Sequence, residues 1–335
     1  MKTDLSAAVP AEGVDAGIAL HYGDPLREQR ILATKAGVVD RSNRDVLQVG
    51  GEERLSWLHT IISQHVENLV DGESTESLVL SPRGHVEQHW QITELGGVIW
   101  LDTEPGAAST VLGYLESMRF LKRVEPADLS ADWAVLSVVG PETPAVLAAA
   151  GLPVPDVHRA AALDGGGFVR GMTWPSSAAA DLVVPRSSVP AFLDRIVAAG
   201  AELAGQWAFE ALRVEARQPR LGFETDHRTI PHEVGWIGSA VHLQKGCYRG
   251  QETVARVQNL GAPPRRLVLL HLSGMSDELP PPGTPVESDG RAVGFLGTAL
   301  QHYELGPIGL AVVKRSLPPD TLLTVAGAPA RVDTQ

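Results

Sequence analysis

Cysteine is almost absent from this sequence, since Cys247 is the only one in 335 residues. One cysteine cannot form a disulfide within the chain, and this favours a reducing compartment. Basic residues are outnumbered, because 28 Lys and Arg face 40 Asp and Glu for a formal net charge of −12. A protein that binds nucleic acid over its whole surface is normally basic, so the charge disfavours that class. A small anionic ligand needs only a local cluster of Arg or Lys and stays compatible with the charge.

Long apolar runs are missing as well. The apolar stretch 267–272 is among the longer ones, and it is far shorter than the roughly 20 residues that cross a membrane. The first residues, MKTDLSAAVPAEG, lack the continuous apolar segment of a signal peptide. We therefore expect a soluble cytoplasmic protein with no membrane partner. Its 44% hydrophobic content is ample for a sizeable core.

The order of the expected elements predicts an α+β protein that ends in an all-β domain. We place a first α/β subdomain at 26–130, a second at 131–261, and a small antiparallel barrel at 262–335. Residues 1–25 show little periodicity, so a loose lead-in is expected there.

Turn-forming residues mark the elements inside these units. The segment 74–103 predicts three strands of a meander, with a break at the Pro-Arg-Gly triplet 82–84. Ser188 stands where a side chain would cap the following helix. The pair Asp289 and Gly290 is typical of a hairpin turn in the last unit.

Cys247 lies in HLQKGCYRGQETVARV, residues 242–257, and the residues alone allow two interpretations. A lone cysteine is usually a small buried hydrophobe. However, Gly246 and Gly250 permit a tight turn and close approach of a ligand. Lys245 would place a cation near the sulfur, and a helix starting at GQETVARVQNLG would point its N-terminus there. Both effects favour the thiolate, which would act as a nucleophile, a redox-responsive thiol or a transient ligand for a soft metal.

The segment GHVEQHW superficially resembles a metal site with two histidines and one carboxylate. His85, Glu87 and His89 would share one face of a strand. Side chains on one strand face point in parallel rather than converging, so we predict no resident metal. TIPHEVGW lacks the second histidine of the zincin helix, and neither a P-loop nor a G-x-S-x-G motif occurs.

The octapeptide KGCYRGQE, residues 245–252, resembles the signature of the YgfZ family. Its members are tetrahydrofolate-binding proteins linked to assembly or repair of iron–sulfur clusters, and one bacterial member is linked to tRNA modification. That family is related to the T-protein, the aminomethyltransferase of the glycine cleavage system. VVDRSNRDVLQVGG and LRVEARQPRLGFETDHRTIPHEVGW are similar to T-protein segments, and PPRRLVLLHL is similar to the start of the shared barrel. The resemblance covers about residues 37–332.

The resemblance implies a T-protein-like core of two interleaved α/β subdomains around a central folate cleft, followed by a C-terminal antiparallel β-barrel. Its cofactor would be tetrahydrofolate or a related reduced folate, and its partners would be iron–sulfur client or assembly proteins. Glu215 matches the T-protein glutamate that holds the pterin ring. A carboxylate suits that ring because it accepts two parallel N–H bonds. The implied reactive residues are Cys247 and Lys245, and the implied folate contacts are Glu215, Trp236, Tyr248, Gln251 and Arg256.

The sequence departs from the T-protein where that enzyme has a pair of aspartates, because Gln88 and His89 stand there instead. Without the carboxylate, proton transfer at the folate nitrogen loses a participant, so catalysis stays open. We expect a folate-binding accessory factor for iron–sulfur proteins. One alternative is a one-carbon transferase or demethylase for a small amine, with His89 or His85 as base. A tRNA-modification factor is disfavoured by the charge, and the last alternative is a relative without a ligand, in which Cys247 is structural.

Overall fold

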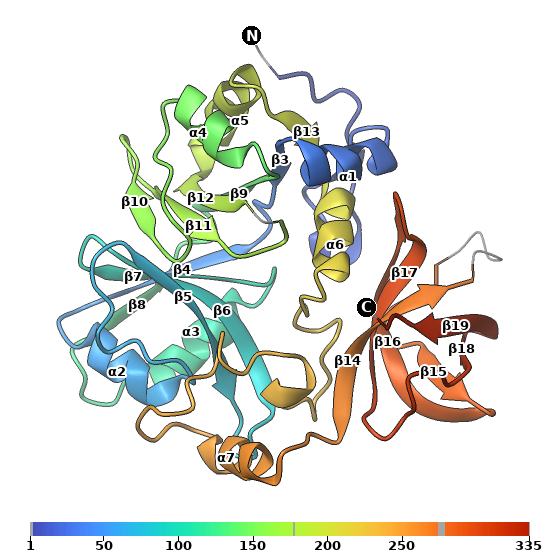
Figure 1. Ribbon diagram of the computed structural model, residues 1–335. Helices are drawn as coiled ribbons and strands as arrows, with labels where there is room; N and C mark the ends of the chain where they lie inside the picture. The colour runs from blue at the N-terminus through green and yellow to red at the C-terminus, as the bar shows by residue number, and fades with distance from the viewer. Residues whose placement is uncertain (1–2, 177, 274–278, 335) are drawn as a thin grey trace.

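The computed structural model describes residues 3–176, 178–273 and 279–334 (Figure 1). Its described strands form two larger open sheets, a small strand pair and a closed six-stranded barrel. The predicted α+β class, with two interleaved subdomains and a C-terminal barrel, is confirmed. None of the helices in the described ranges is long and apolar enough to cross a membrane.

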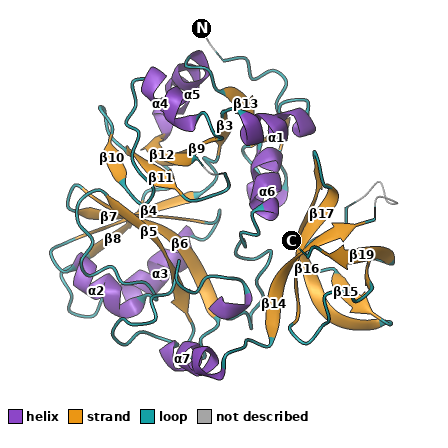
Figure 2. Ribbon diagram, viewed as in Figure 1, coloured by secondary structure: helices purple, strands orange, loops and turns teal. Residues whose placement is uncertain are grey.

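The first open sheet is an antiparallel five-stranded sheet in the order β5-β6-β7-β4-β8. The predicted meander is confirmed, because β5, β6 and β7 are consecutive neighbours. Helices α2 and α3 cover its outer face and bury Trp57, Val111 and Leu115 against it (Figure 2). The elements are β4 (Asp45–Gly50), α2 (Arg54–Ile61), β5 (Glu73–Leu80), β6 (Val86–Leu95), β7 (Val98–Thr103), α3 (Ala108–Ser117) and β8 (Glu125–Asp128).

The second open sheet has the order β10-β11-β12-β9-β3-β13, and helices α4 and α5 cover its outer face. Val46, Phe168 and Val183 are buried together between the two sheets. The molecule therefore has four layers here, with a helical layer outside each sheet. The elements are β3 (Gly37–Asp40), β9 (Trp133–Val139), α4 (Thr143–Ala149), β10 (Ala160–Ala162), β11 (Phe168–Met172), β12 (Ala179–Pro185), α5 (Val189–Ala198) and β13 (Glu202–Ala204).

The chain crosses between the two sheets at residues 41–44. Strand β3 pairs with β9 and β13 of the second sheet, whereas β4, which follows it, pairs with β7 and β8 of the first. Arg41 and Arg44 lie in this crossing and are buried. A segment that looks like a surface turn in the sequence is thus the junction of the two subdomains.

Two local predictions are wrong. Ser188 makes no capping hydrogen bond with its side chain, because its backbone is already helical at the end of a short 3₁₀ turn, Arg186–Ser188. Residues 1–25 are not a loose lead-in throughout, since β1 (Val9–Pro10) pairs with β2 (Ala19–His21). Asp24 caps the first helix, α1 (Pro25–Thr34), through its side chain.

The barrel closes in the order β14-β17-β16-β15-β18-β19. The hairpin predicted at Asp289 and Gly290 joins β15 to β16, and both residues have positive φ, at 50° and 69°. That backbone geometry fits the twist of a two-residue hairpin turn. The strands are β14 (Arg265–Leu272), β15 (Pro285–Ser288), β16 (Arg291–His302), β17 (Gly306–Lys314), β18 (Leu323–Val325) and β19 (Ala328–Val332).

Helix α6 (Gln206–Glu215) lies between the second sheet and the barrel (Figure 1). Phe209 and Leu212 pack with the sheet, while Ala211 and Val214 pack against barrel strands. Two sides of the helix are therefore apolar. Its third side carries polar groups one turn apart, which begin with Gln206 and Glu210.

Candidate functional site

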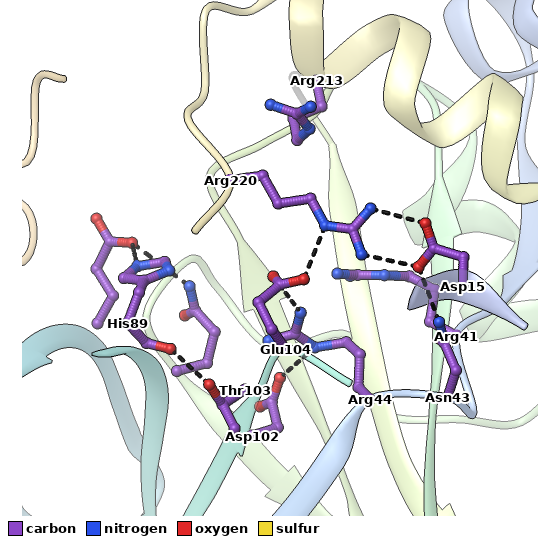
Figure 3. Close-up of polar contacts among 12 residues, drawn as sticks. Asp15, Arg41, Asn43, Arg44, His89, Asp102, Thr103, Glu104, Arg213 and Arg220 are labelled. Atoms are coloured by element: carbon purple, nitrogen blue, oxygen red, sulfur yellow. Dashed lines mark hydrogen bonds and ion pairs between the residues drawn. The ribbon is translucent and has the colours of Figure 1, made fainter. Parts of the chain in front are cut away.

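A polar cavity of about 540 Å³ lies where the two open sheets meet the polar side of α6 (Figure 3). About half of its lining residues are charged. The ionisable lining residues are Asp15, Arg41, Arg44, His89, Asp102, Glu104, Asp181, Glu210, Arg213 and Arg220.

Glu104, just after β7, joins two arginines at the centre of this cavity. One carboxylate oxygen lies 3.2 Å from Arg44 Nη1 and the other lies 2.7 Å from Arg220 Nε. Burial alone would raise the pKa of Glu104, but Arg220 and Arg44 outweigh it and lower the pKa to about 2. Glu104 is therefore ionised at neutral pH and holds the two subdomains together.

Arg220 also reaches back to the N-terminal segment. Its Nη1 and Nη2 donate to the two oxygens of Asp15 at 2.8 and 2.7 Å. Burial opposes the charge on Arg220, but Glu104, Glu210 and Asp15 together raise its pKa above the usual range. The bidentate contact is the strong form of this interaction. It ties residues predicted to be loose to the wall of the cavity.

The polar side of α6 continues the network. Arg213 donates to Glu210, one turn earlier, at 2.7 Å and to Glu224 at 3.1 Å. Gln206 is 5% exposed, and its Oε1 has no hydrogen-bond partner among the described residues. We use the name charge network for Asp15, Arg44, Asp102, Glu104, Arg170, Asp181, Glu210, Arg213, Arg220 and Glu224.

His89 on β6 lines the same cavity, at the position where the resemblance places an aspartate. Its Nε2 lies 2.8 Å from Glu76 Oε2, and its ring stacks on Trp236 with 4.8 Å between centroids. Burial raises the pKa of Glu76, but the hydrogen bond with His89 contributes to a net lowering. His89 is thus an imidazole oriented by a carboxylate, an arrangement that general bases use.

The three residues of the apparent metal site contact different partners. Glu87 is exposed and forms an ion pair with Arg249 at 3.1 Å, whereas His89 contacts Glu76. His85 precedes β6 rather than lying in it. Among the described residues, no group of three or more His, Cys, Asp and Glu side chains is arranged to hold a metal ion.

A second cavity, of about 700 Å³, adjoins the first, because Gln91, Met172 and Trp174 line both. It extends past Glu76 to Gln64. The two cavities form one cleft between the subdomains, which we call the central cleft.

The cysteine loop, residues 245–250, is anchored at the far end of this cleft. Lys245 is buried, and its Nζ donates to the carbonyls of His59, Ile62 and Gln64 at the C-terminal end of α2. Burial lowers the pKa of Lys245 to about 8. A cation suits a helix C-terminus because the carbonyls there have no partners in the helix. The structure places this amino group at the end of α2, where it holds the loop.

Cys247 is exposed, so its interpretation as a buried hydrophobe is wrong. Helix α7 (Gln251–Leu260) begins four residues later, as expected, with Gly250 as its N-cap at φ 83°. A Cβ on Gly250 would lie 2.6 Å from the carbonyl oxygen of Ser81. Only glycine combines that backbone with so close an approach. The loop therefore packs directly on the turn between β5 and β6.

The structure separates the five predicted folate contacts into four places. Tyr248 and Gln251 stay with the cysteine loop, where the ring of Tyr248 lies under Lys245 and Gln251 donates to the Lys245 carbonyl at 3.3 Å. Trp236 is buried and reaches the central cleft through His89. Arg256 is exposed on α7.

Glu215 ends α6 on the side of the barrel. Its carboxylate lies 3.4 Å from His302 Nε2, its side chain is 46% exposed, and it is not among the residues that line the cavity. The carboxylate of α6 that lines the cavity is Glu210. Sequence reasoning missed the charge network. One signal in the sequence was the high density of charged residues in DRSNRD, residues 40–45, which contains Arg41 and Arg44.

A two-sheet core around a polar cleft, joined to a closed barrel, defines a protein of the aminomethyltransferase-like fold class. Residues 22–245 match the GCVT N-terminal domain, and residues 265–335 match the C-terminal β-barrel domain of CAF17. The chain belongs to the YgfZ/CAF17 family, in which these two domains are combined.

Individual relatives agree with this assignment. The crystal structure of glycine cleavage system aminomethyltransferase T from Bartonella henselae has a TM-score of 0.86 at 19% identity, over 98% of this chain and 94% of that one, and shows the same fold. A putative chloroplastic transferase of Arabidopsis thaliana is 25% identical over 83% of this chain. An aminomethyltransferase of Stenotrophomonas maltophilia is 28% identical over 72% of it. The match spans 65% and 70% of those relatives' own lengths.

Proposed function

We propose that this protein is a tetrahydrofolate-binding accessory factor for the assembly or repair of iron–sulfur clusters, which acts in the cytoplasm with Cys247 as its reactive group. One observation carries the proposal. Gln64 lines the central cleft, and its carbonyl accepts a hydrogen bond from Lys245 of the cysteine loop. Gln64 thus joins the site that would bind folate to the loop that carries the exposed thiol of Cys247.

The residues of the central cleft fit a reduced folate. The ligand presents N–H donors, ring nitrogens and an aromatic face, and the cleft offers a matching mixture. Gln206 supplies an acceptor without a partner among the described residues, and Trp174 and Phe209 supply aromatic surface. When bound, reduced folate supplies nitrogens that carry one-carbon units. By the family resemblance Glu215 would hold the pterin, and Trp236, Tyr248, Gln251 and Arg256 would complete the contacts.

The exposed thiol fits a role toward a partner. Common iron–sulfur clusters take about four thiolates, so a single cysteine cannot hold a cluster without further ligands from another molecule. Cys247 is the only cysteine in the chain. We therefore propose that it meets an iron–sulfur client or assembly protein, and that Lys245 positions the loop for that encounter.

A second candidate, a one-carbon transferase or demethylase for a small amine, is favoured by His89. This imidazole lines the cleft and is oriented by Glu76, so it has the arrangement of a general base. Formation of formaldehyde or methylene-tetrahydrofolate from a methylated amine, lost in His89→Asn, would support this candidate. A protein that binds folate but yields neither product favours the accessory role.

The test of the proposal is an anaerobic calorimetric titration with tetrahydrofolate. We expect the wild type to bind, and Glu215→Ala to bind at least 10-fold more weakly if that carboxylate meets the pterin, since bonds to a charged acceptor are strong. Arg217→Ala, two residues later and with a similarly exposed side chain, is the control. Unchanged binding in Glu215→Ala would move the pterin contact elsewhere, and absence of binding in the wild type would refute the folate role.

A further inference from the structure

Arg41 differs from the other buried arginines of the described chain. Each of the other four has carboxylate oxygens of two different residues at 3.2 Å or less. The nearest carboxylate to Arg41 is that of Asp181, at 3.7 Å. In Figure 3 the guanidinium of Arg41 carries no dashed contact to the other residues drawn. The set compared consists of Arg41, Arg44, Arg170, Arg213 and Arg220.

Asp181 does not balance Arg41, because it is already engaged. It lies 2.8 Å from Arg170 Nη2 and accepts a hydrogen bond from the Ser137 hydroxyl at 2.6 Å. Within the described ranges, the one side-chain hydrogen bond of Arg41 goes to that same Ser137 oxygen, at 3.1 Å. The nearest counter-ion of Arg41 is therefore shared and distant, and Asp102 and Glu104 act on its charge from farther away.

The guanidinium of Arg41 faces the cavity and is held in place. Its central carbon lies 4.1 Å from the ring centroid of Phe209 on α6, and the residue is 7% exposed. Burial, with repulsion from Arg44, lowers the pKa of Arg41 to about 10, so it is charged at neutral pH. A buried charge is costly unless it is paired, and the planar guanidinium fork matches a carboxylate.

A second group without a partner among the described residues is Gln206 on α6. It lines the same cavity and is 5% exposed. Its Oε1 is an acceptor without a donor among the described residues. The lining of one cavity therefore holds a weakly paired cation and an acceptor without a partner among the described residues.

We propose that the central cavity contains a subsite for an α-amino-acid-type carboxylate, in which Arg41 binds the carboxylate and Gln206 accepts the neighbouring N–H. This deepens the proposed function and rests on it for the use of the cleft. Two sources have this chemistry. One is the glutamate end of a folate, with its amide N–H, and the other is a free amino acid bound beside the pterin.

The experiment measures binding by anaerobic calorimetry with three probes. 5-Formyltetrahydrofolate carries the pterin and the glutamate, 6-methyltetrahydropterin lacks the glutamate, and N-methylglycine is a free amino acid. The proteins are the wild type, Arg41→Met, Arg41→Lys and Gln206→Leu. Arg27→Met, on an exposed arginine paired with Glu202, is the control for the substitution.

We expect Arg41→Met to bind 5-formyltetrahydrofolate or N-methylglycine about 10- to 100-fold more weakly than the wild type, while its affinity for 6-methyltetrahydropterin changes less than about twofold. The affected probe identifies the source of the carboxylate. Arg41→Lys keeps the charge but not the planar fork of the guanidinium, so it should lose less affinity for that probe than Arg41→Met does. We expect Gln206→Leu to bind the same probe about fivefold more weakly. This variant tests the subsite if a thermal melt shows that Arg41→Met does not fold.

Three results would overturn the subsite: unchanged binding of the carboxylate probes by the variants, an equal loss of affinity for 6-methyltetrahydropterin, or no binding of either carboxylate probe by the wild type. The folate role fails separately, if the wild type binds neither pterin-containing probe. Arg41-dependent binding of N-methylglycine would in that case keep the subsite without the folate.

Discussion

The central cavity draws its charged side chains from positions as far apart as Asp15 and Arg220, whereas the cysteine loop is built from six consecutive residues. The cavity is buried and its charges hold each other in place. The loop is short, exposes Cys247, and is held by one lysine and one close glycine contact. On the proposed function the two regions divide the work: the cavity would bind the folate, and the loop would present a thiol to a partner.

The largest expected effect concerns the cavity. Glu104→Ala leaves Arg44 and Arg220 buried with fewer counter-charges, so we expect a loss of about 3–5 kcal/mol in the free energy of unfolding. Urea unfolding measures it. The control is Glu202→Ala, which removes a surface partner of Arg27 and Lys35 and should cost about 1 kcal/mol or less. Equal effects of the two variants would show that the charge network does not hold the cavity together.

The anchor of the cysteine loop should matter less to the whole molecule. Lys245→Met leaves buried carbonyls at the end of α2 without their donor, so we expect a loss of about 2–3 kcal/mol. Amide hydrogen exchange should speed up in residues 242–250 while the second sheet stays protected. Uniform faster exchange across both sheets would contradict a local role for Lys245.

Two glycines at the ends of α7 provide a matched pair. Gly250 and Gly261 have φ angles of 83° and 81°, so alanine is strained at both. A Cβ added to Gly250 would lie 2.6 Å from the Ser81 carbonyl oxygen, whereas a Cβ added to Gly261 would have nothing within 4 Å. We expect Gly250→Ala to cost about 1–2 kcal/mol more than Gly261→Ala, by backbone strain and clash together. Equal losses in thermal unfolding would mean that the loop does not pack tightly on the β5–β6 turn.

The same contrast explains what the sequence could predict. The order of strands and helices was predictable from periodicity and turns, and the contiguous octapeptide carried the family resemblance. The charge network was not predictable, because its residues come from separate elements and meet only after folding. DRSNRD looks like a surface turn, yet Arg41 and Arg44 are buried where the chain changes sheets.

Helix α6 shows a limit of another kind. Its existence was predictable, but the sequence does not tell which side faces the cavity, since two of its sides are apolar and pack on different neighbours. Glu210 lines the cavity, while Glu215, chosen by resemblance, lies beside His302 near the barrel. The assignment of Glu215 to the pterin stays a prediction.

The most direct test of this division of work is the affinity of Cys247→Ala for tetrahydrofolate, measured anaerobically beside the activity of iron–sulfur enzymes in cells that carry the variant. We predict a dissociation constant within about twofold of the wild type, because the thiol is exposed outside the binding cavity, together with loss of support for those enzymes. Lost folate binding, or full support of the enzymes by the variant, would contradict the account.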